Sequence, residues 1–157
     1  MKKAIYPGTF DPITFGHIDL IKKSLNIFDK VIVAVSDGNT KNYLFNAEER
    51  EHLIKKALFS DLKFNKKKIV VTSFKTLTTD FCRKMKSNVI IRGLRATSDF
   101  EYEFQLAGMN KKLNSKIETM FLMSDVENQI ISSKFVKEIA HLGGNIDRFV
   151  TKNFRYF

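Results

Sequence analysis

Five short apolar runs recur along the 157-residue sequence, each bounded by charged or turn-forming residues. The runs are continuous rather than alternating, so they predict strands that are buried on both faces. Strands of this kind are typical of parallel sheets, because helices cover both sides of such sheets. The five runs are residues 4–6, 31–35, 69–71, 89–91 and 120–123.

The segments between these runs carry apolar residues at helical spacing. Strand and helix therefore alternate, which predicts a five-stranded parallel sheet in a doubly wound, Rossmann-like α/β fold with helices on both faces. No repeat or low-complexity linker interrupts this order, so we expect a single domain over residues 1–157. The helical sets are Ile18, Ile21 and Leu25; Leu53, Ile54, Ala57 and Leu58; Phe104, Leu106, Ala107 and Leu113; and Phe135, Val136, Ile139 and Ala140.

Residue types at three places predict where helices begin and end. Asn46 is a typical capping residue, and acidic residues follow it in the expected first turn. Gly143 and Gly144 are expected to end the helix that precedes them. Residues 145–157 again carry apolar side chains at helical spacing, which predicts a last helix packed on this domain or on a neighbouring chain.

The chain is strongly basic, with 27 Lys and Arg against 17 Asp and Glu and a formal charge of +10. Such a surface attracts anions, and it leaves nucleic acid, membranes and phosphorylated small molecules open as partners, or solvation alone. The apolar run after the first two lysines is too short for a signal peptide, and no run is long enough to span a bilayer. Cys82 is the single cysteine and is expected to be buried in a helix. We therefore expect a soluble, cytoplasmic protein.

The turn after the first strand is the first place to look for a ligand, because doubly wound sheets bind ligands beyond the carboxyl ends of their strands. Pro7 and Gly8 end the strand abruptly, and Gly16 allows close approach of a ligand where the next helix opens. The free amides of that helix favour an anion. His17 lies in its first turn, where an imidazole can donate to a phosphate oxygen, or can serve as a capping or core residue.

Two basic segments are expected at the same edge of the sheet. Arg92 and Arg95 flank Gly93 at the end of the fourth strand, and arginine matches phosphate oxygens bidentately. The alternative is that these arginines pair with nearby acidic residues, namely Asp99, Glu101 or Glu103. Lys41 follows the second strand after a polar loop and either reaches over the edge or is solvated.

Ser132, Ser133 and Lys134 open a helix after the fifth strand. Hydroxyls and amides at such a position either hold phosphates or simply cap the helix. The sequence contains no Walker-type loop, no zinc-like cluster of Cys and His, and no GxGxxG. Four elements suited to anions at one sheet edge favour a site that binds phosphate groups. The missing motifs argue against a kinase, a zinc enzyme and a dinucleotide dehydrogenase.

Residues 14–17, Thr-Phe-Gly-His, resemble the T/HxGH signature of nucleotidyltransferases related to class I aminoacyl-tRNA synthetases. Residues 91–110, IRGLRATSDFEYEFQLAGMN, are closely similar to the phosphopantetheine adenylyltransferase family, as are residues 45–50 and 131–133. The resemblance covers nearly the whole chain. It implies a nucleotidyltransferase domain that transfers AMP from ATP to 4′-phosphopantetheine, with magnesium arriving with ATP and no dedicated metal site.

The resemblance also implies roles for individual residues. His17 would stabilise charge on the α-phosphate, while Lys41 and Arg92 would hold the acceptor phosphate and complete the catalytic set. Thr9 would contact both substrates, and Thr78 would touch the pantetheine arm. The remaining nucleotide contacts would come from Phe10, Gly93, Leu94, Arg95, Glu103, Asn128, Gln129, Ile130, Ile131, Ser132, Ser133 and Lys134. Members are typically hexamers inhibited by coenzyme A, with no nucleic-acid or membrane partner.

The sequence departs from the family pattern just before and after Ile131. Asn128, Gln129 and Ile130 replace the usual aromatic, Ser and aromatic residues, and Lys134 stands in place of a third serine. We hypothesise that the Lys134 ammonium reaches the β- or γ-phosphate, and the alternative is a side chain in solvent. Two other functions stay open, a sister enzyme acting on nicotinamide mononucleotide or glycerol phosphate, and a basic nucleic-acid-binding domain.

Overall fold

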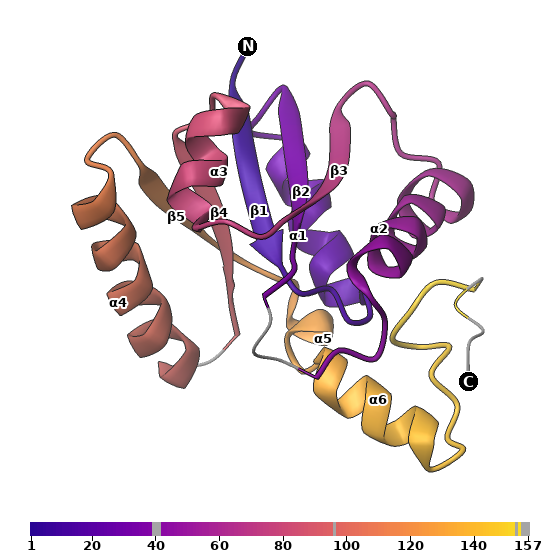
Figure 1. The fold of residues 1–157 in the computed structure, drawn as a ribbon. Helices are drawn as coiled ribbons and strands as arrows, with labels where there is room; N and C mark the ends of the chain where they lie inside the picture. Colours follow the sequence, from indigo (N-terminus) through magenta and orange to yellow (C-terminus); the bar gives the residue numbers. More distant parts are fainter. Residues whose placement is uncertain (39–41, 96, 153, 155–157) are drawn as a thin grey trace.

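The computed structural model describes residues 1–38, 42–95, 97–152 and 154. Strands and helices alternate along the chain, as the apolar pattern predicts (Figure 1). The elements are β1 (Lys3–Gly8), α1 (Phe15–Leu25), β2 (Lys30–Ser36), α2 (Ala47–Lys55) with a π-helical continuation η1 (Lys56–Asp61), β3 (Ile69–Phe74), α3 (Thr78–Met85), β4 (Val89–Leu94), α4 (Thr97–Leu113), β5 (Glu118–Met123), α5 (Val126–Gln129) and α6 (Ser133–His141).

The five strands form one parallel sheet in the order β3-β2-β1-β4-β5. The chain winds outward from β1 to β3, crosses back, and then builds β4 and β5 on the other side of β1. This order confirms the doubly wound prediction. It also places a topological switch point between β1 and β4, where crevices for ligands form.

Each face of the sheet has its own apolar core. On one face, Tyr6, Val33 and Ile91 pack with buried residues of α1 and α2. On the other face, Ile5 and Ile90 pack with residues of α3, including the buried Cys82. Alternate residues of one strand therefore point to opposite layers, and in Figure 1 α3 lies in front of the sheet and α1 behind it.

The prediction of full burial is wrong for β5 and for part of α4. Residues 119–122 are only half-buried, and the Met123 side chain is 58% exposed. On α4, Phe104 is 62% and Leu113 55% exposed, although their spacing predicts a core face. The reason is position, because β5 is an edge strand with a single neighbour and α4 covers that edge only in part (Figure 1).

Two predicted helix boundaries are confirmed by hydrogen bonds. The Asn46 side chain accepts from the Glu49 backbone N–H at 2.9 Å, and the Glu49 carboxylate accepts from the Asn46 N–H at 2.8 Å. At the end of α6, Gly143 has a positive φ of 76° and Gly144 donates to the Ile139 carbonyl at 2.8 Å. Glycine suits this left-handed C-terminal motif because it carries no Cβ.

The predicted last helix is absent from the described part of residues 145–154, which instead forms short turns. The apolar side chains there are nevertheless buried: Val150 is 1% exposed and packs with Leu53 and Val136. The Phe149 carbonyl accepts a hydrogen bond from the Phe15 N–H at 2.9 Å. Turns therefore bury the apolar residues that a helix was expected to bury, and the segment packs on this chain. No helix in the described ranges is long and apolar enough to cross a membrane.

Candidate active site

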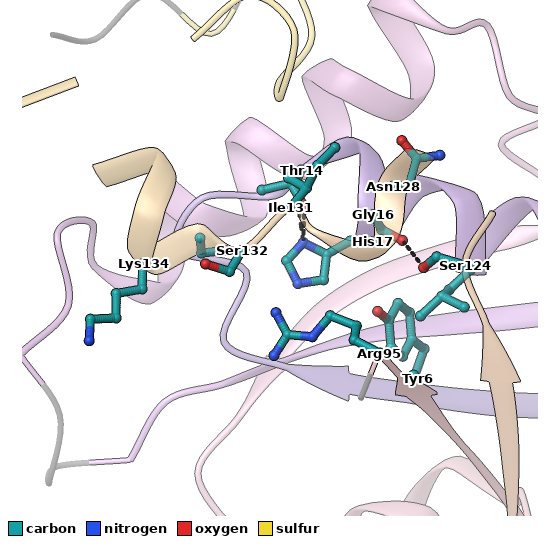
Figure 2. A pocket seen from close by; sticks show the side chains of 13 residues that line it. Tyr6, Thr14, Gly16, His17, Arg95, Ser124, Asn128, Ile131, Ser132 and Lys134 are labelled. Carbon is teal, nitrogen blue, oxygen red and sulfur yellow. Dashed lines mark hydrogen bonds between the residues drawn. The ribbon is translucent and has the colours of Figure 1, made fainter. Parts of the chain in front are cut away.

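A cavity of about 310 Å³ lies at the carboxyl edge of the sheet, between the first turn of α1, the end of β4 and the segment from β5 to α6 (Figure 2). This is the edge at which the sequence predicts a phosphate-handling site. The lining residues are Tyr6, Thr14, Gly16, His17, Leu20, Gly93, Arg95, Ser124, Asn128, Ile131, Ser132, Ser133 and Lys134.

Thr14 caps α1 and fixes the orientation of the His17 ring. The Thr14 backbone N–H donates to Nδ1 of His17 at 3.1 Å, and the Thr14 hydroxyl lies at the same distance from Nδ1. Since Nδ1 accepts a hydrogen bond from the backbone N–H, the proton of a neutral ring must sit on Nε2. Figure 2 shows the ring between Thr14 and Arg95. The imidazole therefore presents an N–H donor to the cavity.

The His17 ring is neutral in the free protein. Burial in the cavity wall, and to a lesser degree the positive charge of Arg95, lower the pKa of His17 to about 4 from an ordinary 6.5. A neutral imidazole that donates through one nitrogen can stabilise an anion without carrying charge itself.

The Phe10 ring packs against the imidazole of His17 and supports it. Its ring packs edge-on against His17 with centroids 5.0 Å apart and against Tyr6 at 5.3 Å. Phe10 is 1% exposed, and its φ of +49° is a conformation that non-glycine residues adopt only when their surroundings impose it. Phe10 was expected to contact the nucleotide, but its side chain lies behind the cavity wall.

Arg92 and Gly93 are neighbours on β4 and serve opposite faces of the sheet. Gly93 faces α1: a Cβ on Gly93 would lie 2.4 Å from the Leu20 side chain, which lines the cavity. Arg92 faces α4, where its Nε and Nη2 donate to the two carboxylate oxygens of Glu103, each at 2.7 Å. Its Nη1 donates to the Pro7 carbonyl at 3.1 Å.

These ion pairs match the alternative that the sequence left open for the two arginines. Burial by itself lowers the pKa of Arg92, but the hydrogen bonds and charge of Glu103 outweigh it and raise the pKa above its ordinary value. Arg95 pairs with Asp99 at 3.1 Å and also lines the cavity. Arg95 thus both pairs with an acidic residue and lies at the predicted phosphate site, whereas Arg92 pairs with an acidic residue and does not line the cavity.

The start of α6 closes the cavity and is tied to the first turn. The Ser132 hydroxyl accepts from the Phe135 N–H at 3.2 Å and so caps the helix, while its own hydrogen stays available to a ligand. The Ser133 hydroxyl donates to the Pro12 carbonyl at 2.7 Å. Lys134 is exposed at the rim, and Figure 2 shows its side chain extending away from His17.

Eight of the 17 residues expected to bind nucleotide or acceptor line this cavity. They are His17, Gly93, Arg95, Asn128, Ile131, Ser132, Ser133 and Lys134. The expected residues that the cavity does not bring together are Thr9, Phe10, Thr78, Arg92, Leu94, Glu103, Gln129 and Ile130. Gln129 donates instead to the Ser124 carbonyl at 3.0 Å, and Ile130 is 80% exposed. Lys41 lies outside the described residues.

Sequence reasoning missed four lining residues, namely Tyr6, Thr14, Leu20 and Ser124, whereas Gly16 lines the cavity as expected. Thr14 lies inside the motif that pointed to His17, and Ser124 directly follows β5, so their place in the chain was the available signal. Burial raises the pKa of Tyr6 well above its ordinary value, with Arg92 and Arg95 opposing part of the rise. The Tyr6 phenol is therefore protonated.

Arg50 is a further residue whose role the sequence did not indicate. Its side chain is fully buried, and Nη1 donates to the carbonyls of Thr9 at 2.8 Å and Ser36 at 2.9 Å. Nε donates to the Phe45 carbonyl at 3.0 Å. Arg50 thus joins the ends of β1 and β2 to the start of α2, and it holds the Thr9 turn in place.

Comparisons with known proteins agree with this fold. The cytidylyltransferase-like family model matches residues 5–139. The phosphopantetheine adenylyltransferase of Pelagibacter ubique (strain HTCC1062) is 74% identical over 98% of this chain and 94% of its own length. The enzyme of that name from Nautilia profundicola is 49% identical over 94% of this chain and 93% of its own length.

Solved structures share the fold at low sequence identity. The Plasmodium falciparum nicotinic acid mononucleotide adenylyltransferase has a TM-score of 0.72 at 17% identity, covering 96% of this chain and 90% of that one. A bifunctional NMN adenylyltransferase/ADP ribose pyrophosphatase from Francisella tularensis also has a TM-score of 0.72, at 16% identity, covering 97% of this chain and 45% of that one. With its family model and its relatives both matched over most of its length, this chain belongs to the cytidylyltransferase-like nucleotidyltransferases and, within them, to the phosphopantetheine adenylyltransferase family.

Proposed function

We propose that this enzyme transfers the adenylyl group of ATP to 4′-phosphopantetheine, releasing pyrophosphate and forming dephospho-coenzyme A in coenzyme A biosynthesis. The observation that carries the proposal is the His17 imidazole, held neutral by burial and oriented by Thr14 so that Nε2–H faces the cavity. Membership of the phosphopantetheine adenylyltransferase family supports the choice of acceptor.

The reaction needs no nucleophile from the protein. An oxygen of the acceptor phosphate attacks the α-phosphorus of ATP in line, and the bond from that phosphorus to the bridging oxygen of the β-phosphate breaks. Pyrophosphate leaves with the bonding electron pair, and no covalent enzyme intermediate forms. Catalysis then depends on positioning and on donors aimed at the charge that develops on the α-phosphate. His17 Nε2–H supplies one such donor.

The nucleotide would occupy the described cavity. Arg95 supplies a positive charge there, and the first turn of α6 supplies backbone N–H groups together with the Ser132 hydroxyl hydrogen. The acceptor would approach from the face of the sheet on which Arg92 lies, with Thr78 at the start of α3 on the same side. Lys41, which follows β2, is proposed to assist Arg92, and Thr9 to contact both substrates.

Magnesium is proposed to enter with ATP. Among the described residues that line the cavity there is no carboxylate, and the described ranges hold no cluster of three His, Cys, Asp or Glu side chains. Mg²⁺ is commonly bound through substrate phosphates and water rather than an all-protein cage. The ligands of the ion would therefore come from the triphosphate and from solvent.

We further propose that residues 1–157 act as one nucleotidyltransferase domain in a cytoplasmic homohexamer that coenzyme A inhibits. The incompletely covered apolar residues of α4 and β5, such as Phe104 and Met123, are consistent with burial between subunits. Inhibition by coenzyme A would follow from its pantetheine arm, which it shares with the acceptor. No nucleic acid or membrane takes part in this scheme.

The test is pyrophosphate release from ATP and magnesium with a panel of phosphorylated acceptors. We expect strong preference for 4′-phosphopantetheine over nicotinamide mononucleotide and glycerol 3-phosphate. Equal or better turnover with either of the other two would overturn the proposed acceptor. Steeply salt-dependent RNA or DNA binding without any adenylyl transfer would point instead to a nucleic-acid-binding protein.

A further inference from the structure

The segment that follows β5 is tied to α1 by polar bonds at three consecutive residues. The Lys23 ammonium donates to the Met123 carbonyl at 2.7 Å, and it also donates to the Asp125 carboxylate at 2.8 Å. The Ser124 hydroxyl donates to the Gly16 carbonyl at 3.4 Å (Figure 2). Each of the three residues is therefore held against the same helix.

Asp19 accepts the shortest of the bonds between α1 and this segment. Its Oδ2 accepts from the backbone N–H of Asp125 at 2.6 Å and lies 3.4 Å from the Lys23 ammonium. The Asp19 side chain is only 9% exposed, whereas that of Asp125 is 61% exposed. A buried carboxylate is stable only where hydrogen bonds and an opposite charge compensate its lost hydration. Asp19 and Lys23, the anchor pair, therefore form a built contact between α1 and the segment.

Apolar packing holds this segment only weakly. Met123 is 58% exposed, and Val126 and Ile130, which follow the tied residues, are 83% and 80% exposed. Within the described sheet, β5 is an edge strand paired with β4. Because so little apolar area is buried here, the position of the segment depends on its polar bonds to α1.

The tied segment forms one wall of the cavity. Ser124 and Asn128 line it, and the Asn128 N–H donates to the Asp125 carbonyl at 2.8 Å. The Asn128 carbonyl in turn accepts from the Ile131 N–H at 3.2 Å. This carbonyl also lies against the first turn of α1, since a Cβ on Gly16 would be 3.3 Å from it. A shift of Asp125 would therefore move the wall relative to the helix that carries the imidazole.

This wall lies at one end of the proposed nucleotide site. In Figure 2, Ser124 and Asn128 lie on one side of His17, and Lys134 lies on the other. With the α-phosphate at His17 and the outer phosphates at the first turn of α6, the nucleoside would extend toward the wall. The helix α1 then carries the phosphate donor and also fixes the surface against which the nucleoside binds.

We propose that Asp19 and Lys23 are positioning residues for the nucleoside end of ATP. They hold residues 123–125 against α1 and so set the distance between the wall and His17. The inference rests on the proposed function, in which ATP occupies this cavity. Neither side chain of the anchor pair lines the cavity, so both act through the segment that they hold.

The first test is Lys23→Met, with binding of ATP and of pyrophosphate measured by calorimetry in the presence of magnesium. We expect the ATP Kd to rise by about 10-fold, because this one ammonium holds two of the three tied residues. The pyrophosphate Kd should stay within about twofold of the parent, because pyrophosphate occupies only the distant phosphate end. The matched control is Lys22→Met, at an exposed position one residue earlier on α1, which should change neither constant.

The second test removes the carboxylate of the anchor pair. Asp19→Ala leaves the Asp125 N–H without its acceptor and should raise the ATP Kd by about 10-fold or more, whereas Asp19→Asn keeps an acceptor oxygen and should recover part of the affinity. Asp19→Ala should add little to Lys23→Met, because both release the same segment. The control is Asp29→Ala just before β2, where an exposed carboxylate accepts from the Lys2 N–H at 2.7 Å.

Two results would overturn the inference. Unchanged ATP affinity in Lys23→Met would show that the anchor pair stabilises the fold and nothing more, and this variant decides alone if Asp19→Ala does not fold. Equal losses of ATP and pyrophosphate affinity would show that the substitutions disturb the whole site rather than its nucleoside end. A parent that binds ATP but transfers nothing to 4′-phosphopantetheine would refute the proposed function, while the ATP measurements would still decide the role of the anchor pair.

Discussion

The backbone N–H of Thr14 donates to Nδ1 of His17 at 3.1 Å, and this single bond determines which nitrogen of the ring faces the cavity. The orientation is coded locally, because Thr14 and His17 are the first and last residues of one short motif at the start of α1. Burial keeps the ring uncharged, so the site offers a hydrogen-bond donor without the cost of a buried cation.

His17→Ala should lower turnover by on the order of 100-fold or more, because a preorganised donor to developing charge acts mainly in the transition state. Binding of ATP should weaken much less. Single-turnover rates at saturating substrate and calorimetric titration with ATP measure the two effects separately. His52→Ala, at an exposed position on α2, is the control. Collapse of ATP affinity with a normal single-turnover rate would instead identify His17 as a ground-state ligand.

The depressed pKa of His17 predicts how stability changes with pH. Between pH 6.5 and about 4 the unfolded chain binds a proton at this residue and the folded protein does not. The contribution of the neutral His17 to the free energy of unfolding is therefore complete above pH 6.5 and is lost as the pH falls toward 4. Relative to His17→Gln, the parent should lose about 2 kcal/mol of unfolding free energy between pH 7.5 and pH 5 in urea titrations. Parallel pH profiles for the two proteins would contradict the assigned pKa.

Gly93→Ala should impair nucleotide binding through Leu20. A Cβ on Gly93 would lie 2.4 Å from the Leu20 side chain, which must then shift, and Leu20 lines the cavity. We expect the ATP Kd to rise by about 10-fold, with partial recovery in the double variant with Leu20→Val. The matched control is Gly108→Ala on α4, where an added Cβ meets nothing within 4 Å. Equal ATP affinities in the Gly93→Ala variant and the parent would show that Leu20 moves away from the cavity.

Lys134→Ser should weaken ATP binding several-fold and reduce its dependence on ionic strength. Lys134 stands at the cavity rim, and its side chain extends away from His17, on the side where the outer phosphates would lie if the α-phosphate meets the imidazole (Figure 2). Affinity for the acceptor should hardly change. Lys112→Ser, at an exposed site near the end of α4, is the control for net charge. An unchanged ATP affinity and salt slope would leave Lys134 as a solvated surface residue.

The apolar pattern predicts the fold well where burial is complete. Val33 and Ile91 belong to strands with neighbours on both sides, so their runs carry an unambiguous signal. The same signal misleads for Met123 and Phe104. These residues are apolar like core residues, but they lie at the edge of the sheet and are exposed. For Val150, the spacing of apolar residues correctly predicts burial but wrongly predicts a helix. Short turns can bury apolar residues at the same spacing.

The site was predictable to the level of the sheet edge. The rule that ligands meet the carboxyl ends of parallel strands explains why His17, Arg95 and Ser132 converge. That rule does not say on which face of the sheet a residue acts, and the expectation for Glu103 came from the family resemblance alone. The support of His17 by Phe10 depends on the path of a single turn, which no local pattern encodes.

The bond from Phe15 to Phe149 has a consequence for the order in which the enzyme is made. Phe15 begins the helix that carries His17, and its N–H is bound by a carbonyl near the other end of the chain. A ribosome releases the amino-terminal strands and helix long before it synthesises Phe149. The nascent polypeptide therefore lacks the partner of this first-turn N–H until Phe149 has been synthesised. An interrupted translation product would carry the histidine motif without this link to the carboxyl-terminal segment.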